Sequence, residues 1–189
     1  DGLVLRAEMF AHCAGGGETQ RGDEPLFGWI RLRIHRLCPA LPLESRYGFQ
    51  LLIEDPWMGA NMQLRQFEVQ SGVHAYQKVL AMDDGRVVEP DGKVRLGVAP
   101  GKTCTGMVFS PRDEKLACDR LFVELPVRAG AFVDVLVPML ACDRTTFERE
   151  LALGYDGARR EANRFWKKEL QTATRFVTPE PEVNDAIRQ

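Results

Sequence analysis

Acidic side chains are the first candidates for chemistry in this sequence, which contains 27 Asp and Glu residues. Cleavage of a glycosidic bond needs two carboxyl groups that lie about 5 Å or about 6.5–9.5 Å apart across the bond. The adjacent pairs Glu54-Asp55 and Asp83-Asp84 lie among turn residues. Neighbouring residues of a strand point to opposite faces, so adjacency does not build such a pair. We therefore interpret these residues as solvated turn residues and assign no catalytic residue.

Patterns for a nucleophile or a metal are missing from the sequence. Cys104 lies between two threonines, with no histidine close to it in the sequence. The three histidines, His12, His35 and His74, have no partner at the spacing of metal ligands. The five cysteines are too far apart to form the CxxC pairs of structural zinc sites. We expect no metal site and no cofactor.

Aromatic side chains near polar groups give a weaker signal for ligand binding. The loop of residues 55–61 carries Trp57 and ends at Asn61. An indole face beside hydrogen-bonding groups suits a sugar ring, because one side of such a ligand is apolar and its rim is polar. Trp29 lies on the same face of its expected strand as Arg31. Trp57, Asn61 and Trp29 are therefore our candidate ligand contacts, and a place in the core is the alternative for both tryptophans.

The composition argues against two classes of partner. The formal net charge is -2, whereas a nucleic-acid-binding domain usually carries a basic surplus. No apolar run approaches the roughly 18 residues that a membrane-spanning helix needs. Hydrophobic residues make up 44% of the chain and charged residues 28%, which are ordinary values for a globular protein. We predict a folded protein with neither a nucleic-acid nor a membrane partner.

Short strands separated by Gly, Pro and Asp turns dominate residues 1–143. Residues 27–36 alternate most clearly, with Ile30 and Ile34 on the face that must be buried. Arg31 and Arg33 share the other face, which we expect to meet water or a partner. The turn at residues 83–85, Asp-Asp-Gly, predicts a tight hairpin. This pattern predicts a mainly β fold, an antiparallel β-sandwich.

Residues 144–189 change to helical spacing. Thr145 and Glu148 have the form of a capping box, which predicts a short helix to about Leu153. A second, amphipathic helix is expected from Asp156, and its apolar stripe needs a surface to cover. We interpret the stripe, with its tryptophan, as packing residues: Ala158, Ala162, Phe165 and Trp166.

Two segments of this tail resemble a junction found in large glycoside hydrolases. They are residues 155–170, YDGARREANRFWKKEL, and residues 176–185, FVTPEPEVND. In those enzymes an N-terminal supersandwich is followed by a linker helix with a Trp near its end. A short extended piece then leads to a Pro-x-Pro-x-x-Asn-Asp-like start of an (α/α)6 toroid, the six-hairpin glycosidase type of catalytic domain.

The resemblance implies that residues 1–143 are a non-catalytic N-terminal region of a carbohydrate-active hydrolase. Residues 144–189 would be the helical linker and the start of the following domain. The acid and base carboxylates of the family belong to the toroid, so none is carried over to this chain. The implied partners are the catalytic domain of the same protein and, through the full-length enzyme, a carbohydrate substrate.

The alternative hypothesis is a stand-alone β-sandwich module that binds glycans or a protein. It would use the Trp57 loop or the strand face of Trp29, Arg31 and Arg33. A small enzyme with a site assembled from distant residues is a third hypothesis. The sequence that follows Gln189 separates the first hypothesis from the others, because only the first requires several hundred further residues with a helical repeat pattern.

Overall fold

The computed structural model describes residues 3–16, 24–37, 46–54, 80–99, 104–113, 118–126 and 128–172. The elements in the described part of the chain are nine strands and one helix. Their bounds are β1 Leu3–Cys13, β2 Leu26–Leu37, β3 Arg46–Glu54, β4 Ala81–Asp83, β5 Arg86–Val88, β6 Val94–Ala99, β7 Gly106–Asp113, β8 Cys118–Pro126, β9 Phe132–Pro138 and α2 Arg144–Thr172.

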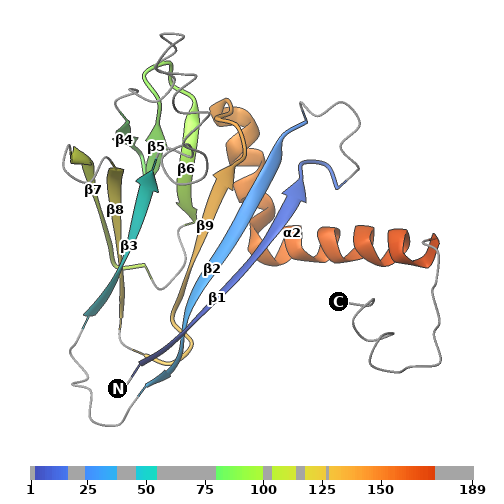
Figure 1. Cartoon of the computed structure of the whole chain (residues 1–189), viewed down its shortest axis with the longest axis horizontal. Helices are drawn as coiled ribbons and strands as arrows, with labels where there is room; N and C mark the ends of the chain where they lie inside the picture. Colours follow the sequence, from blue (N-terminus) through green and yellow to red (C-terminus); the bar gives the residue numbers. More distant parts are fainter. Residues whose placement is uncertain are drawn as a thin grey trace, which may run out of the picture.

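The strands form two antiparallel sheets, and α2 follows them (Figure 1). The larger sheet has the order β1-β2-β9-β6-β5-β4, and the smaller one has the order β3-β8-β7. Every described strand pair is antiparallel. The prediction of a mainly β, sandwich-like fold with a C-terminal helix is confirmed.

The main core lies between the two sheets. Alternate residues of β8 point into it, and Leu121, Val123 and Leu125 are fully buried. Ile34 of β2 and Val135 of β9 face them from the larger sheet. The apolar face predicted for residues 27–36 is therefore the inner face of the sheet, as the alternation requires.

The hairpin of β4 and β5 is closed by the turn that the sequence predicts. Asp83 pairs with Arg86, and the two residues between them both have positive φ, 44° at Asp84 and 72° at Gly85. Positive φ at both central residues defines the type I′ turn, which matches the twist of paired strands. The hairpin also holds the start of α2, because Arg144 donates to the carboxylate of Asp83 at 2.7 Å.

Asp143, not Thr145, caps the start of α2, so the predicted capping box is wrong. The Asp143 carboxylate accepts hydrogen bonds from the Thr146 backbone N–H at 2.8 Å and from its hydroxyl at 2.7 Å. Glu148 does not reach back to the cap. It accepts two hydrogen bonds from the Arg86 guanidinium instead, at 2.9 and 3.1 Å. Asp is among the strongest cap residues, and the sequence places it one residue before the arginine that begins the helix.

Replacing Asp143 by asparagine should make the free energy of unfolding fall less between pH 5 and pH 3. Hydrogen bonds from Thr146 hold the pKa of Asp143 below its ordinary value of 3.8. Its contribution to stability is therefore complete above the unfolded-state pKa and disappears as the pH falls through the lower, folded-state pKa. Asn still caps helices but does not titrate. Urea unfolding at pH 5 and pH 3 should show a smaller difference for Asp143→Asn than for the wild type, and an equal difference would contradict this.

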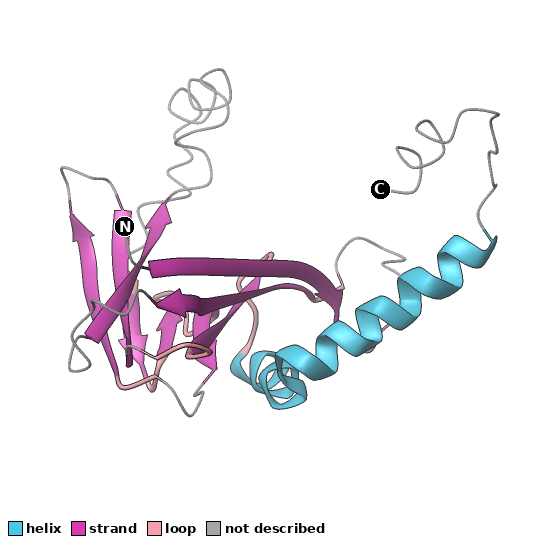
Figure 2. Cartoon of the chain, turned by 90° about the horizontal axis from the view of Figure 1, so that it is seen from below, coloured by secondary structure: helices cyan, strands magenta, loops and turns pink. Residues whose placement is uncertain are grey.

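A single glycine divides α2 into two segments. Gly154 has φ 72° and ψ 161°, which lie outside the helical range, so the helix bends there. The break lies between the two helices predicted from the sequence. We call residues 144–153 the first segment and residues 155–172 the second segment. Figure 2 shows the second segment running past the strands and away from the body of the sheets.

Candidate functional site

The outer face of β2 is covered by the chain's own helix. This face carries Trp29 and Arg31, which we expected to meet water or a partner, but Trp29 is 0% exposed and Arg31 is 6% exposed. The expectation is wrong because the alternation within one strand cannot show that a helix more than a hundred residues later covers its second face. Trp29 belongs to a second core with Phe27, Val94, Leu136, Phe147, Tyr155 and Ala158.

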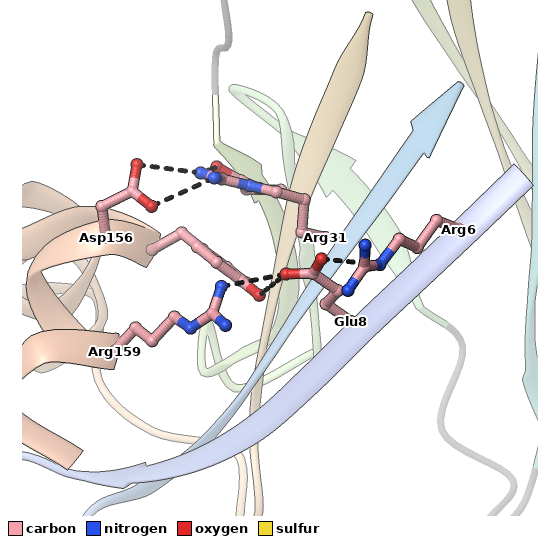
Figure 3. Close-up of polar contacts among 7 residues, drawn as sticks. Arg6, Glu8, Arg31, Asp156 and Arg159 are labelled. Atoms are coloured by element: carbon pink, nitrogen blue, oxygen red, sulfur yellow. Dashed lines mark hydrogen bonds and ion pairs between the residues drawn. The ribbon is translucent and has the colours of Figure 1, made fainter. Parts of the chain in front are cut away.

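Arg31 is the main polar link between the sheet and α2. Its guanidinium donates to Asp134 of β9 at 2.6 and 2.8 Å and to Asp156 of the second segment at 3.1 and 3.3 Å (Figure 3). It also lies 3.9 Å from the ring centre of Tyr155 and 4.4 Å from that of Phe132. Burial opposes the charge, but the two carboxylates raise the pKa of Arg31 above its ordinary value. The buried cation is therefore neutralised from both elements.

Glu8 of β1 forms a second polar link to the helix (Figure 3). Its carboxylate accepts from Arg6 of the same strand at 2.9 Å and from Arg159 of the second segment at 2.9 Å. The Tyr155 hydroxyl also donates to it, at 3.3 Å. Desolvation opposes the charged form, but the two arginines hold the pKa of Glu8 below its ordinary value. Glu8 therefore fixes the second segment beside the edge of the sheet.

His12 joins both helical segments to β1. Its Nδ1 lies 2.7 Å from Oε1 of Glu150, and its Nε2 lies 3.2 Å from Oε2 of Glu161. Trp29 Nε1–H donates to the same Glu150 oxygen at 2.8 Å. The three side chains form a hydrogen-bonded triad that spans the Gly154 bend, with His12 and Glu150 buried and Glu161 at its open side.

A groove lies between β1 and the second segment, with a volume of about 1060 Å³. Its strand side includes Met9 and Phe10, and its helix side includes Asn163 and Trp166. Glu161 enters it from the triad with its side chain 35% exposed. The remaining lining residues are Arg6, Glu8, Ala11, His12, Cys13, Gly16, Leu26, Tyr155, Arg159, Ala162 and Phe165. Aromatic walls with a carboxylate, a guanidinium and an amide on them can hold a ligand that is apolar on one side and polar at its rim.

None of the ligand contacts predicted from the sequence is among the described residues that line the groove. Trp57 and Asn61 lie outside the described residues. Trp29 is buried, and its indole N–H is occupied by Glu150, so its ring has no face at the surface. Trp166, which we expected to pack, is 60% exposed. The structure thus places an exposed indole at the end of α2 and a buried one beneath its beginning.

Sequence reasoning missed the residues of the triad. His12 and Glu150 are 138 positions apart, and no local spacing joins them. Glu150 and Glu161 lie in different segments of α2, on either side of the Gly154 bend, so helical spacing does not relate these two carboxylates either.

The described residues offer no metal cluster and no activated thiol. No group of three or more His, Cys, Asp or Glu among them could hold a metal ion. Burial raises the pKa of the Cys13 thiol, and burial likewise raises that of Cys142 to about 11. A thiol is a poor nucleophile when its pKa is raised, because little thiolate is present at neutral pH.

No family model, no curated protein and no solved structure matches the chain. Among the described helical residues, none forms a stretch long and apolar enough to cross a membrane.

Proposed function

We propose that this chain is a non-catalytic β-sandwich region of a carbohydrate-active enzyme of the glycoside-hydrolase type. In this proposal α2 connects the sandwich to a following (α/α)6 catalytic domain, which packs on the exposed end of the helix. The resemblance of residues 155–170 and 176–185 to such a junction supports it. The observation that carries it is the contrast between the two segments of α2.

The first segment and the beginning of the second are packed against the sheet, whereas the end of the second segment is exposed. Glu150 of the first segment is buried against His12 and Trp29. Near the end of the second segment, Trp166 is 60% exposed and Leu170 is 65% exposed. Full burial of an apolar side chain of this size contributes about 1.5–3 kcal/mol. A helix that is fixed at one end and apolar at the other is suited to carry a further domain.

The test is the protein made from the intact reading frame. We expect the frame to continue past Gln189 with several hundred residues of helical repeat. The whole protein should hydrolyse a glycosidic substrate in a screen of chromogenic glycosides, and the 189-residue chain alone should not. A frame that ends within a few residues of Gln189 would contradict the proposal, as would turnover by the isolated chain.

Replacing Trp166 by alanine should leave the isolated chain almost unchanged. The ring is mostly exposed, and such substitutions usually change the free energy of unfolding by less than about 0.5 kcal/mol. In the whole protein the same change removes apolar contact with the next domain, so the thermal transition should fall and should separate into two steps. Lys168→Ala, at an exposed position on the same segment, is the control. If the two variants of the whole protein, Trp166→Ala and Lys168→Ala, had the same thermal transition, a domain contact at Trp166 would be contradicted.

Glycan binding by the sandwich itself is the second candidate function. The observation that favours it is the exposed Trp166 in a groove that also presents Asn163 and Glu161. An indole face with an amide and a carboxylate beside it can stack on a sugar ring and bind its hydroxyls. Binding of the 189-residue chain on a glycan array, lost in Trp166→Ala, would support this function. An array without signal would contradict it and would leave the connector proposal as it stands.

A further inference from the structure

We infer that β1 is a dimerisation strand, which pairs antiparallel with β1 of a second copy of this chain. This inference goes beyond the proposed function and does not depend on it. β1 lies at the end of the six-stranded sheet and pairs with β2, its one neighbour among the described strands. Within the described part of the chain its other edge has no strand partner, so the backbone N–H and C=O groups along it can pair with a further strand.

β1 is a long edge strand with exposed apolar side chains on its inner face. It is eleven residues long and contains no proline. Its register shift lies near its start, between Val4 and Leu5, and its charged residues Arg6 and Glu8 lie on the other face of the strand. On the inner face, Met9 is 72% exposed and Leu5 is 49% exposed. Apolar edges of natural sheets are usually short or covered, so this long apolar inner face indicates a strand that has a partner.

The smaller sheet does not cover this end of the larger one. Leu5, Ala7 and Met9 pair with inward-facing residues of β2, so they belong to the inner face of the sheet. The same face is buried at Ile34 of β2 and Val135 of β9. The larger sheet has six strands and the smaller has three. The inner face thus continues as exposed apolar surface onto β1, where a second copy can cover it.

The order of residues along β1 is complementary to itself. A two-fold axis perpendicular to the sheet and through Ala7 places Leu5 opposite Met9 of the second copy. It also places Arg6 of each copy opposite Glu8 of the other, which gives two such pairs. Directly opposite residues on one face interact, and opposite charges there are favourable. An axis moved by one residue in either direction would place Arg6 or Glu8 opposite its own copy, which is unfavourable. The charges therefore select one register.

The second segment of α2 borders the open edge of β1. Figure 1 shows α2 continuing past β1 on the side away from β2. The groove between β1 and the second segment runs along the same edge. Glu8 lies at its border, where it already accepts from Arg6 and Arg159 of its own chain. A second copy would bring one more arginine to each Glu8 carboxylate.

A charge exchange tests the register as well as the dimer. By sedimentation and light scattering, the wild-type chain should have twice its 21.3 kDa mass at high concentration. Arg6→Glu alone and Glu8→Arg alone should each raise the dissociation constant about tenfold or more, because each places like charges opposite one another. An equimolar mixture of the two variants should form a heterodimer, since the new charges are then opposite in sign at both pairs.

Two outcomes would overturn the inference. One is a wild-type chain that stays monomeric at every concentration up to near-millimolar. The other is a dimer that forms equally well with Arg6→Glu, because that dimer would use another surface. Circular dichroism and thermal melting of each variant check that it is folded. Met9→Lys provides a second test at a side chain that is mostly exposed, and it should also give a folded monomer.

Discussion

Replacing Arg31 by alanine is expected to lower the free energy of unfolding by about 3–5 kcal/mol, which is the usual cost of removing one partner from a buried ion pair. The buried Asp134 would lose two hydrogen bonds that it accepts from the guanidinium. Tyr155 and Phe132 would lose the cation between their rings. Urea unfolding followed by circular dichroism measures the change, provided that the slope with urea stays that of the wild type.

The control for Arg31 is an arginine on the same side of the sheet that is not buried. Arg159 also bonds a carboxylate, but its side chain is 50% exposed, so water screens the pair and Arg159→Ala should have a far smaller effect. The prediction would be contradicted if Arg31→Ala lowered the free energy of unfolding by no more than Arg159→Ala does. Arg31→Met combined with Asp134→Leu should recover most of the stability, because an apolar pair replaces a buried ion pair at little cost.

Replacing Phe147 by alanine is expected to cost about 3–5 kcal/mol, since the ring is fully buried and its removal leaves a cavity. The ring anchors the first segment of α2 on the sheet. It packs edge-on against Phe27, with ring centres 6.4 Å apart. It also packs on Gly97 beside the flexible side chain of Arg86, and an added Cβ at Gly97 would come within 2.7 Å of both. Leu153→Ala, at a partly exposed position of the same segment, should cost clearly less.

The contact between Phe147 and Gly97 gives this prediction a sharper form. Gly97→Ala alone should destabilise the chain by about 1–3 kcal/mol, because the methyl group overpacks the site. In the Phe147→Ala background the same methyl group enters the space that the ring has left, so its cost should be smaller. A double-mutant cycle measures the difference. If the free-energy changes of Phe147→Ala and Gly97→Ala simply added in the double mutant, the close packing of Phe147 on Gly97 would be contradicted.

Local patterns in the sequence predict much of this fold. The alternation at residues 27–36 identifies the inner face of β2, which Ile34 confirms. Asp84 and Gly85 predict the type I′ turn because few other residues adopt positive φ there. The helix start is predicted to within one or two residues, but Asp143 and Thr145 are both good caps and propensity alone does not choose between them. In the structure, the hydrogen bonds that Asp143 accepts from Thr146 make Asp143 the cap.

The candidate site could not be predicted because it consists of long-range contacts. Trp29 has the alternation of an exposed face, and only the docking of α2 buries it. Glu150 and His12 each lack a partner within their own elements and meet across 138 residues. The exposure of Trp166 depends on the direction of the second segment after Gly154, which two backbone dihedrals set. No pattern of residue types specifies that direction.

The position of β9 in the larger sheet has a consequence for how the chain is made. Residues of β2 from Phe27 to Arg33 pair with β9 residues from Pro138 back to Phe132, so roughly a hundred residues must be added before β2 gains its second neighbour. At translation rates of about 5–20 residues per second, that wait lasts roughly 5–20 s. A two-stranded ribbon is at best marginally stable alone. The ribbon of β1 and β2 is therefore exposed on the ribosome for seconds, and its protection during synthesis depends on β9, the last of the described strands to be made.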